Sequence, residues 1–350
     1  MPQDPFTILA FQFLALRRMQ KFLIIQTAFI GDVVLATCLV EKLHEVFPDA
    51  QIDFLLRKGN ESLLNGHPYL HEVLVWDKKT SKYESLWKML LKIRRNKYDK
   101  VINLQRFAAT GFLTVFSGAK ERIGFDKNPF GFLFSTRVKH QIGDANHPRH
   151  EIERNLHLVK GFTNNLIMRP RLYPLPADFA FVESYQNHPY ICIAPASVWF
   201  TKQYPPEKWI SFLKKVPETH SVYLLGAPGE TALCEEIRLN VNRQTVINLA
   251  GQLSYLQSAA LMKNARMNYV NDSAPMHFAS AMNAPVTAVY CSTIPAFGFG
   301  PLSDKSFIVE VEENLSCRPC GLHGRKTCPL GHFHCAYHIR DEQLLQTIGK

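Results

Sequence analysis

The stretch FLIIQTAFIGDVVLATCL, residues 22–39, is the feature that most limits what this chain can fold into. Its first four residues are apolar, which is typical of a strand buried on both faces, and apolar residues recur at helical spacing after a short loop. A strand, a loop and a helix in this order begin many nucleotide-binding α/β domains. This loop, however, lacks the G-x-G-x-x-G pattern that holds a phosphate, and a carboxylate at Asp32 would repel one. The pattern predicts a parallel sheet and leaves the acid to be explained.

Short apolar runs alternate with helix-like segments along the rest of the chain. Residues 32–47 predict a helix, because apolar side chains recur every three to four positions and Pro48 ends the pattern. This alternation favours parallel sheets with helices on both faces, in which ligands bind at the loops after the strands. The predicted strands are residues 22–25, 52–56, 73–76, 101–104, 190–193, 221–226, 268–270 and 286–290.

The alternation weakens between residues 163 and 189, where proline and asparagine are frequent, and then begins again. We interpret this stretch as a linker between two α/β domains of similar size, with a cleft between them. The length of 350 residues agrees with two domains. The predicted division is an extension at 1–18, a first domain at 19–165, a linker at 166–189, a second domain at 190–315 and a tail at 316–350.

The first 18 residues do not read as a targeting segment. Residues 6–16 are apolar but too few to span a bilayer. Arg17 and Arg18 follow this run, whereas a signal peptide carries its charge before the apolar part. We therefore expect no secretion and an extension that lies outside the fold. A weak amphipathic membrane anchor is the alternative interpretation.

The composition indicates a folded chain with an acidic partner. Hydrophobic residues make up 46% of the sequence, which supplies enough material for two cores. The formal net charge of +10 favours a phosphorylated ligand, a nucleic acid or an anionic membrane surface. Ten of the cations lie between Lys78 and Arg106, where Leu86, Leu90 and Ile93 give the predicted helix an apolar side. A solvated helix face explains this run equally well.

Polar loops follow the strands of the second half. Ser197, Thr201 and Lys202 lie after the strand at 190–193, and hydroxyls with a lysine suit a phosphate, although a solvated lysine would look the same. The turn GAPGE, residues 226–230, presents Glu230, which can accept bonds from ribose hydroxyls or can serve only as an acid in the first turn of a helix.

The segment VNDSAPMHFASAM, residues 270–282, places polar residues at a helix start near Pro275. The free N–H groups of a helix start bind anions, and Ser273 can donate to a phosphate. Asp272 would otherwise be a simple N-cap, and a lone histidine such as His277 is more often structural than functional. The segment is therefore a candidate anion site.

Several short motifs together resemble glycosyltransferase family 9, the bacterial ADP-heptose:lipopolysaccharide heptosyltransferases. The resemblance covers about residues 19–310 and implies a GT-B architecture, in which two Rossmann-like domains face each other across a cleft. It implies that the acceptor lies mostly on the first domain and the nucleotide sugar on the second. The motifs are FIGDVVLA at the first strand end, LQRFAATG at 104–111, RIGFD at 122–126, KQYPPEKW at 202–209, GAPGE, NLAGQLS at 248–254 and NDSAPMHFASA at 271–281.

The resemblance assigns roles to residues of this sequence. It implies that Asp32 is the catalytic base and that Lys202 contacts the phosphate and sugar of the donor. It also implies a donor contact at Ala274, where the family usually has glycine, so the added methyl group can crowd the diphosphate. The other residues that it places at the donor are Ser197, Thr201, Glu230, Leu253, Asp272, Ser273 and His277.

These assignments answer the question raised by Asp32. If the second domain holds the phosphates, the acid of the first domain can face the acceptor hydroxyl and remove its proton. A helix start favours the ionised form of a carboxyl, so we expect Asp32 to be charged. A simple N-cap is the alternative.

We expect an inverting, single-displacement transfer from an ADP-sugar, stabilised by Lys202 and the helix start near Ser273. No Asp-x-Asp pattern is present to hold a divalent metal on the diphosphate, so no cofactor is expected for catalysis. The expected acceptor is a phosphorylated, lipid-linked saccharide. We further expect a monomer in the cytoplasm, peripheral to the inner membrane, and no nucleic-acid partner.

The tail contains the cluster CRPCGLHGRKTCPLGHFHC. In a cytosolic chain such a cluster favours metal over disulfides, although the second half of the pattern is C-x6-C rather than C-x2-C. A structural zinc site and unbridged or redox-labile thiols both remain open. The cysteines concerned are Cys317, Cys320, Cys328 and Cys335.

Two other functions remain open from the sequence. A net charge of +10 and a Cys/His cluster also fit a basic, zinc-containing nucleic-acid-binding protein. Against it, the basic run and the cysteines lie in different predicted domains. A GT-B enzyme that uses another nucleotide sugar is the second alternative.

Overall fold

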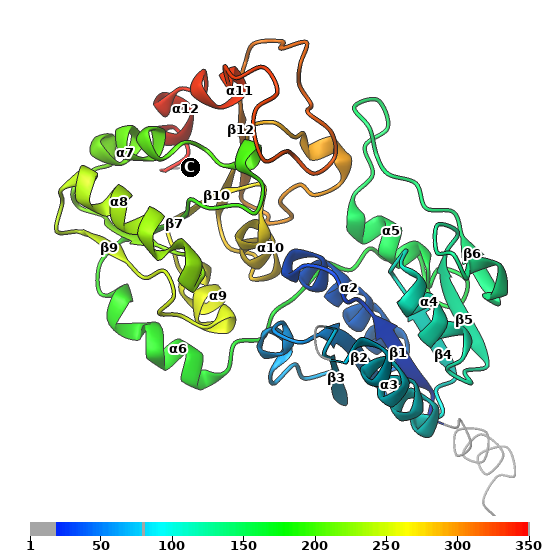
Figure 1. Cartoon of the computed structure of the whole chain (residues 1–350). Coiled ribbons are helices and arrows are strands. Elements are labelled where there is room, and N and C mark those ends of the chain that lie inside the picture. Colours follow the sequence, from blue (N-terminus) through cyan, green and yellow to red (C-terminus); the bar gives the residue numbers. More distant parts are fainter. Residues whose placement is uncertain (1–18, 79–80, 349–350) are drawn as a thin grey trace, which may run out of the picture.

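The computed structural model describes residues 19–78 and 81–348 and shows two parallel six-stranded sheets with helices on both faces, one sheet in each half of the chain (Figure 1). The predicted α/β architecture of two facing domains is confirmed. The expected extension at residues 1–18 lies outside the described residues. No helix in the described part of the chain is long and apolar enough to cross a membrane.

The N-terminal sheet has the strand order β3-β2-β1-β4-β5-β6. Strand β1 lies inside the sheet, and every residue from Phe22 to Ile25 is fully buried. Its apolar side chains point to both faces of the sheet, so both faces need a covering layer. All its neighbours pair in parallel. The strands are β1 (Lys21–Ile25), β2 (Gln51–Arg57), β3 (Glu72–Trp76), β4 (Lys100–Asn103), β5 (Glu121–Phe125) and β6 (Thr136–Val138).

Helices cover the two faces of this sheet in different ways. Helix α2 (Ile30–Val46) packs against α5 (Glu151–His157) and against α10 of the second half. Helices α3 (Lys82–Asn96) and α4 (Ala108–Val115) form the other layer, where Leu90 and Ile93 enter a separate core. The α3–α4 layer is therefore the outer layer of the N-terminal domain, and the α2 layer is the inner one.

The C-terminal sheet repeats the pattern, with the order β12-β11-β10-β7-β8-β9. Its outer face carries α7 (Pro206–Lys215), α8 (Thr231–Val241) and the closing helix α12 (Asp341–Leu345), and its inner face carries α9 (Tyr255–Lys263) and α10 (Ala274–Ala281). The strands are β7 (Tyr190–Ala194), β8 (Ser221–Leu224), β9 (Val246–Asn248), β10 (Met267–Asn271), β11 (Val286–Tyr290) and β12 (Ser306–Glu310).

The chain between the domains lies along α2. Thr37 Oγ1 accepts the backbone N–H of Arg171 at 2.9 Å, and the Tyr173 hydroxyl donates to Glu41 at 3.0 Å. The predicted linker is partly helical, because α6 (Pro176–Val182) begins at a proline that is already set for a helical turn. One continuous core joins the inner faces of both domains.

The expected strands all form, with ends that differ by a few residues at most. The sequence reading did not predict β5, β6, β9 and β12. Strands β6 and β9 have only three residues each, and β12 lies at a sheet edge, so none of the three shows a long apolar run. The helix predicted for residues 32–47 forms as α2.

Candidate active site

The helix starts that follow the two central strands, β1 and β10, meet between the domains. Gly31 in the first turn of α2 lies so close to α10 that a Cβ on it would be 2.9 Å from Cδ2 of His277 and 3.7 Å from Cα of Ala274. Figure 1 shows these two helices side by side at the centre of the molecule. Asp32, the next residue, is therefore at the junction between the two sheets.

Asp32 is the third residue of α2 and is half-buried. Its Oδ2 accepts the backbone N–H of Phe29 at 3.2 Å, so it closes the first turn from inside the helix and is not the N-cap. Burial, and then the charge of Glu151, raise the pKa of Asp32 to about 7, against the opposing effects of the Phe29 N–H and Arg57. The helix start was expected to keep Asp32 charged, but loss of water outweighs its effect and raises the pKa.

Glu151 is the charged neighbour that the sequence reading missed. It begins α5, its backbone N–H donates to the carbonyl of Gly298 at 2.8 Å, and its carboxylate pairs with Arg154. The hydrogen bond to Gly298 connects α5 of the first domain to a loop of the second. The only signal in the sequence was the acid at a helix start, and nothing in the sequence connected it to Asp32.

Lys202 and Asp272 form the centre of the polar cluster on the C-terminal sheet. The Lys202 ammonium lies 2.6 Å from Oδ2 of Asp272, and the two side chains are 14% and 7% exposed. The hydroxyl of Thr293 donates to the same oxygen at 2.7 Å. The Lys202 ammonium and the backbone N–H groups at the start of α10 together place positive charge beside this acid.

A buried amide holds the loops that carry this pair. Asn271, the last residue of β10, accepts the backbone N–H of Tyr204 at 3.0 Å and donates to the carbonyl of Pro195 at 2.7 Å. It is fully buried, so these bonds are costly to lose. Asn271 therefore sets the distance between the loop after β7 and the loop after β10, a role that the sequence reading did not identify.

Thr201 does not have the role that was expected for it. Its hydroxyl accepts the N–H of Arg325 at 2.7 Å and the hydroxyl of Ser292 at 2.9 Å, and the side chain is 1% exposed. The hydroxyl thus joins three loops and does not face a ligand. Ser197 lies half-buried in the same loop, where its carbonyl accepts the amide of Gln203.

No side chain of the described residues caps the backbone N–H groups at the start of α10. Ser273 is the N-cap, but its hydroxyl is directed at the carbonyl of Asn271, 3.4 Å away, and does not cap the helix. Ala274 is the first helical residue and is half-buried. His277 is buried, and burial, followed by the charges of His150 and Lys202, lowers its pKa to about 3. The imidazole of His277 is therefore neutral beside the helix start.

The two residues expected at the nucleoside lie in the loops after β8 and β9 of the same sheet. Glu230 accepts the backbone N–H of Ala227 at 2.7 Å, which is the helix-acid role that the sequence left open. Leu253 is half-buried in the loop between β9 and Ser254, the N-cap of α9. All these loops follow carboxyl ends of strands, as the fold requires of a ligand site.

Cations surround the loop of Asp32 on the N-terminal sheet. The Lys78 ammonium donates to the hydroxyl of Thr27 at 2.7 Å, and burial, followed by the charge of Arg57, lowers the pKa of Lys78 to about 8. The Arg57 guanidinium lies 5.1 Å from the centre of the Phe29 ring. Anionic groups of a ligand on this side of the cleft would therefore meet positive charge close to Asp32.

The four cysteines of the tail are all free thiols. Burial, and then the neighbouring thiols, raise the pKa of Cys335 to about 12. No group of three or more histidine, cysteine, aspartate or glutamate side chains within the described residues is arranged to hold a metal. The zinc site therefore gains no support from the geometry and stays a prediction, which elemental analysis of protein purified under reducing conditions would decide.

The comparisons with known proteins agree on one family. A sequence model of glycosyltransferase family 9 (heptosyltransferase) matches residues 86–334. Lipooligosaccharide heptosyltransferase 2 of Haemophilus ducreyi is 24% identical over 314 residues, which cover 83% of this chain and 88% of that protein.

Two solved structures have the same fold. The structure of Escherichia coli ADP-heptose lps heptosyltransferase II is similar with a TM-score of 0.77 at 21% identity, covering 94% of this chain and 97% of that chain. Escherichia coli heptosyltransferase WaaC with ADP-2-deoxy-2-fluoro heptose gives a TM-score of 0.69 at 16% identity, covering 93% and 99%. The two facing sheets are thus those of a GT-B enzyme. Because the family match covers most of the chain and the motifs lie where the fold places a site, the chain belongs to glycosyltransferase family 9, the heptosyltransferases, and is a glycosyltransferase.

Proposed function

We propose that this chain moves a heptose, or a closely similar sugar, from an ADP-sugar to a lipid-linked acceptor of the lipopolysaccharide core. One observation carries the proposal: Gly31, the residue before Asp32, contacts the start of α10 in the second domain, and the pair of Lys202 and Asp272 lies at the same helix start. The proposed base of one domain and the proposed anion site of the other thus lie where the starts of α2 and α10 meet. Relatives named as lipopolysaccharide heptosyltransferases support the choice of substrates.

The proposed reaction is a single displacement with inversion. The Asp32 carboxylate takes the proton of the acceptor hydroxyl while that oxygen forms a bond to the anomeric carbon of the sugar. The bond between this carbon and the diphosphate oxygen breaks, and ADP leaves with the electron pair. Lys202 and the N–H groups at the start of α10 stabilise the negative charge of the leaving group.

The raised pKa of Asp32 suits this role. A carboxyl with a pKa of about 7 is a stronger base than an ordinary aspartate, yet it is still partly ionised at neutral pH. Glu151 contributes to this by its negative charge. We also propose that no metal is needed, since Lys202 and the helix start supply the positive charge that a metal would otherwise give. Full activity after treatment with a chelator is the expected result.

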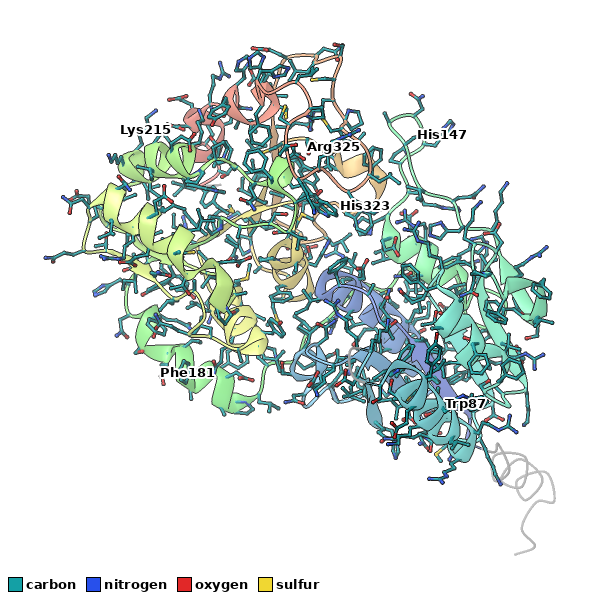
Figure 2. All side chains as sticks on the ribbon, in the orientation of Figure 1. Trp87, His147, Phe181, Lys215, His323 and Arg325 are labelled. Carbon is teal, nitrogen blue, oxygen red and sulfur yellow. The ribbon has the colours of Figure 1, made fainter. Side chains whose placement is uncertain are left out.

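The acceptor would reach this site from a membrane surface. Helix α3 exposes Tyr83, Trp87 and Leu91 on one side, and the Trp87 ring meets that of Phe112 on α4 at 5.7 Å (Figure 2). The same helix carries exposed cations at Lys88, Lys92, Arg94 and Arg95. Aromatic side chains between cations suit the interface of an anionic bilayer, so we propose peripheral binding at the cytoplasmic face of the inner membrane.

Vesicle sedimentation tests this surface. Binding is expected to vesicles that contain anionic phospholipid, to weaken with salt and to fall in Trp87→Ala. Equal binding of the wild type and this variant would show that the α3 surface is not used.

A transfer assay tests the reaction. Purified protein is incubated with ADP-heptose and a truncated lipopolysaccharide core, and both ADP release and the anomeric configuration of the product are measured. Turnover with inverted configuration is the expected result. Ala274, which replaces the usual glycine, favours a second candidate, a different nucleotide sugar, so UDP- and GDP-sugars are tested in parallel. Turnover with those alone would exclude ADP-heptose as the donor.

A further inference from the structure

The tail loop, defined as residues 317–328, is bound directly to the loop that carries Lys202. The backbone N–H of Thr201 donates to the carbonyl of Arg325 at 3.1 Å, and the N–H of Arg325 returns a bond to the Thr201 hydroxyl at 2.7 Å. The N–H of Cys320 donates to the carbonyl of Ser292 at 2.9 Å. Three hydrogen bonds thus hold the tail loop against the residues around Lys202.

A second attachment reaches Asp272. The guanidinium of Arg318 donates to the carbonyls of Cys291 and Thr293, both at 2.8 Å. The Thr293 hydroxyl in turn donates to the Asp272 carboxylate. The tail loop therefore supports both members of the pair formed by Lys202 and Asp272.

Gly324 brings the tail loop into contact with the Lys202 side chain itself. A Cβ on Gly324 would lie 2.8 Å from Cγ of Lys202 and 3.1 Å from Oγ1 of Thr201. Its φ of +75° is also in the left-handed region, which favours glycine. This close approach places the preceding residue, His323, at the same edge of the cleft.

His323 is exposed and lies among charges from both domains. Partial burial, and then the charges of Lys202 and Arg106, lower the pKa of its imidazole, whereas Asp272 opposes them. Arg106 belongs to the loop after β4 in the first domain. Figure 2 shows His323 and Arg325 on the tail loop, at the side of the C-terminal domain that faces the N-terminal domain. A diphosphate bound beside Lys202 would therefore lie near this imidazole.

We propose that the tail loop forms one wall of the donor site and that His323 binds the diphosphate of the nucleotide sugar. The imidazole N–H donates to a phosphate oxygen, and Gly324 allows the loop to approach Lys202. This inference rests on the donor site proposed above. It gives the cysteine-rich tail a part in substrate binding in addition to any structural part.

Calorimetry with ADP-heptose and with adenosine tests the proposal. In His323→Ala the affinity for ADP-heptose should fall about ten-fold, the effect of one hydrogen bond to a charged group, while adenosine binds as before. His188→Ala, at an exposed histidine before β7 and outside the tail loop, should change the affinity for neither ligand. Gly324→Ala should also weaken ADP-heptose binding, because its methyl group displaces Lys202, and melting temperatures monitor folding.

Lys202→Ala is measured beside these variants to separate two failures. If Lys202→Ala weakens ADP-heptose binding and His323→Ala does not, the tail loop is not part of the donor site. If neither variant weakens it, the donor site itself is wrong. Equal loss of ADP-heptose and adenosine binding in His323→Ala would also overturn the proposal, since the imidazole would then not act at the diphosphate.

Discussion

Two aspartates occupy similar positions in the two halves of the molecule and have different surroundings. Asp32 follows the central strand β1, accepts one backbone N–H and lies near the negative charge of Glu151, so its pKa is raised to about 7. Asp272 follows the central strand β10, pairs with Lys202 at 2.6 Å and accepts a bond from Thr293. The first arrangement suits a proton acceptor, and the second suits an acid that holds a cation in place.

The difference arises from the loops around each acid and not from the strands. The loop after β1 places Asp32 inside the first turn of α2, with its cations further away at Arg57 and Lys78. In the second half, the loop after β7 returns to β10 and places Lys202 directly on Asp272. Two similar sheets thus supply two different chemistries, and changes on each side should have separable effects.

The largest expected effect separates the two halves by their function. Asp32→Asn should lower turnover by about 10²–10⁴, because an amide cannot accept the acceptor proton. The affinity for ADP-heptose should be unchanged, since the proposed donor site lies in the other half. Asp49→Asn, at an exposed position after α2, is the control. Near-normal turnover of Asp32→Asn with an authentic acceptor would remove this residue from the mechanism.

The reverse pattern is expected for Lys202→Ala. Loss of a bond to a charged group costs about 1.5–3 kcal/mol, so ADP-heptose should bind at least about ten-fold more weakly. Adenosine, which lacks the diphosphate, should be affected less. Lys214→Ala, an exposed lysine of α7, serves as control in the same calorimetric titrations. Equal weakening for both ligands would mean that Lys202 does not contact the diphosphate.

The pH dependence tests the raised pKa of Asp32. Because the base must be ionised, kcat/KM should fall about ten-fold for each pH unit below the pKa of about 7. The raised pKa of Asp32 also predicts the direction in which folding stability changes with pH. The folded protein holds this proton more tightly than the unfolded chain, so Asp32 should lower stability as the pH rises from 3.8 to about 7.

Asp32→Asn removes that titration. We therefore compare the melting temperatures of Asp32→Asn and the wild type at an acid pH and at a pH above neutral. The difference should favour the variant more at the higher pH. An activity profile without an acid limb near neutral pH, or an equal melting difference at both pH values, would show that the pKa of Asp32 is not raised.

A smaller effect is expected where the two halves touch. Gly31→Ala would place a methyl group 2.9 Å from His277 and push the two helix starts apart. Since a misplacement of about 1 Å can cost about 100-fold in rate, a shift of a few tenths should reduce kcat by less than that. Gly161→Ala, where the new methyl group meets no atom within 4 Å, is the matched control. Equal kcat values for the two variants would show that this contact does not set the geometry.

The smallest expected effect is at the start of α10. Ala274→Gly restores the residue that the family usually has, and the helical cost of glycine is at most about 1 kcal/mol. If the methyl group crowds the diphosphate, ADP-heptose should bind somewhat more tightly to the variant. Unchanged affinity would show that Ala274 leaves the donor enough room, and a nucleotide sugar that the wild type binds more tightly than the variant would be the better candidate for the native donor.

Local sequence patterns alone were enough to predict both sheets and the place of most site residues. Short apolar runs rich in β-branched and aromatic residues, with helical patterns between them, favour buried strands, so β1, β7, β10 and β11 were predictable from local pattern. The same pattern placed Asp32, Lys202 and Asp272 in loops at the carboxyl ends of strands. The motifs around them were sufficient to indicate the family.

The role of each site residue depends on contacts between distant segments of the chain. Burial and Glu151 set the pKa of Asp32, and both depend on the packing of segments that are distant along the chain. Thr201 was expected at the donor, but its hydroxyl bonds to Ser292 and to the tail instead. Hydrogen bonds and electrostatic interactions act over a few ångströms between such segments, and no local pattern records them. The approach of Gly324 to Lys202 is of the same kind, and the sequence of the tail gave no sign of it.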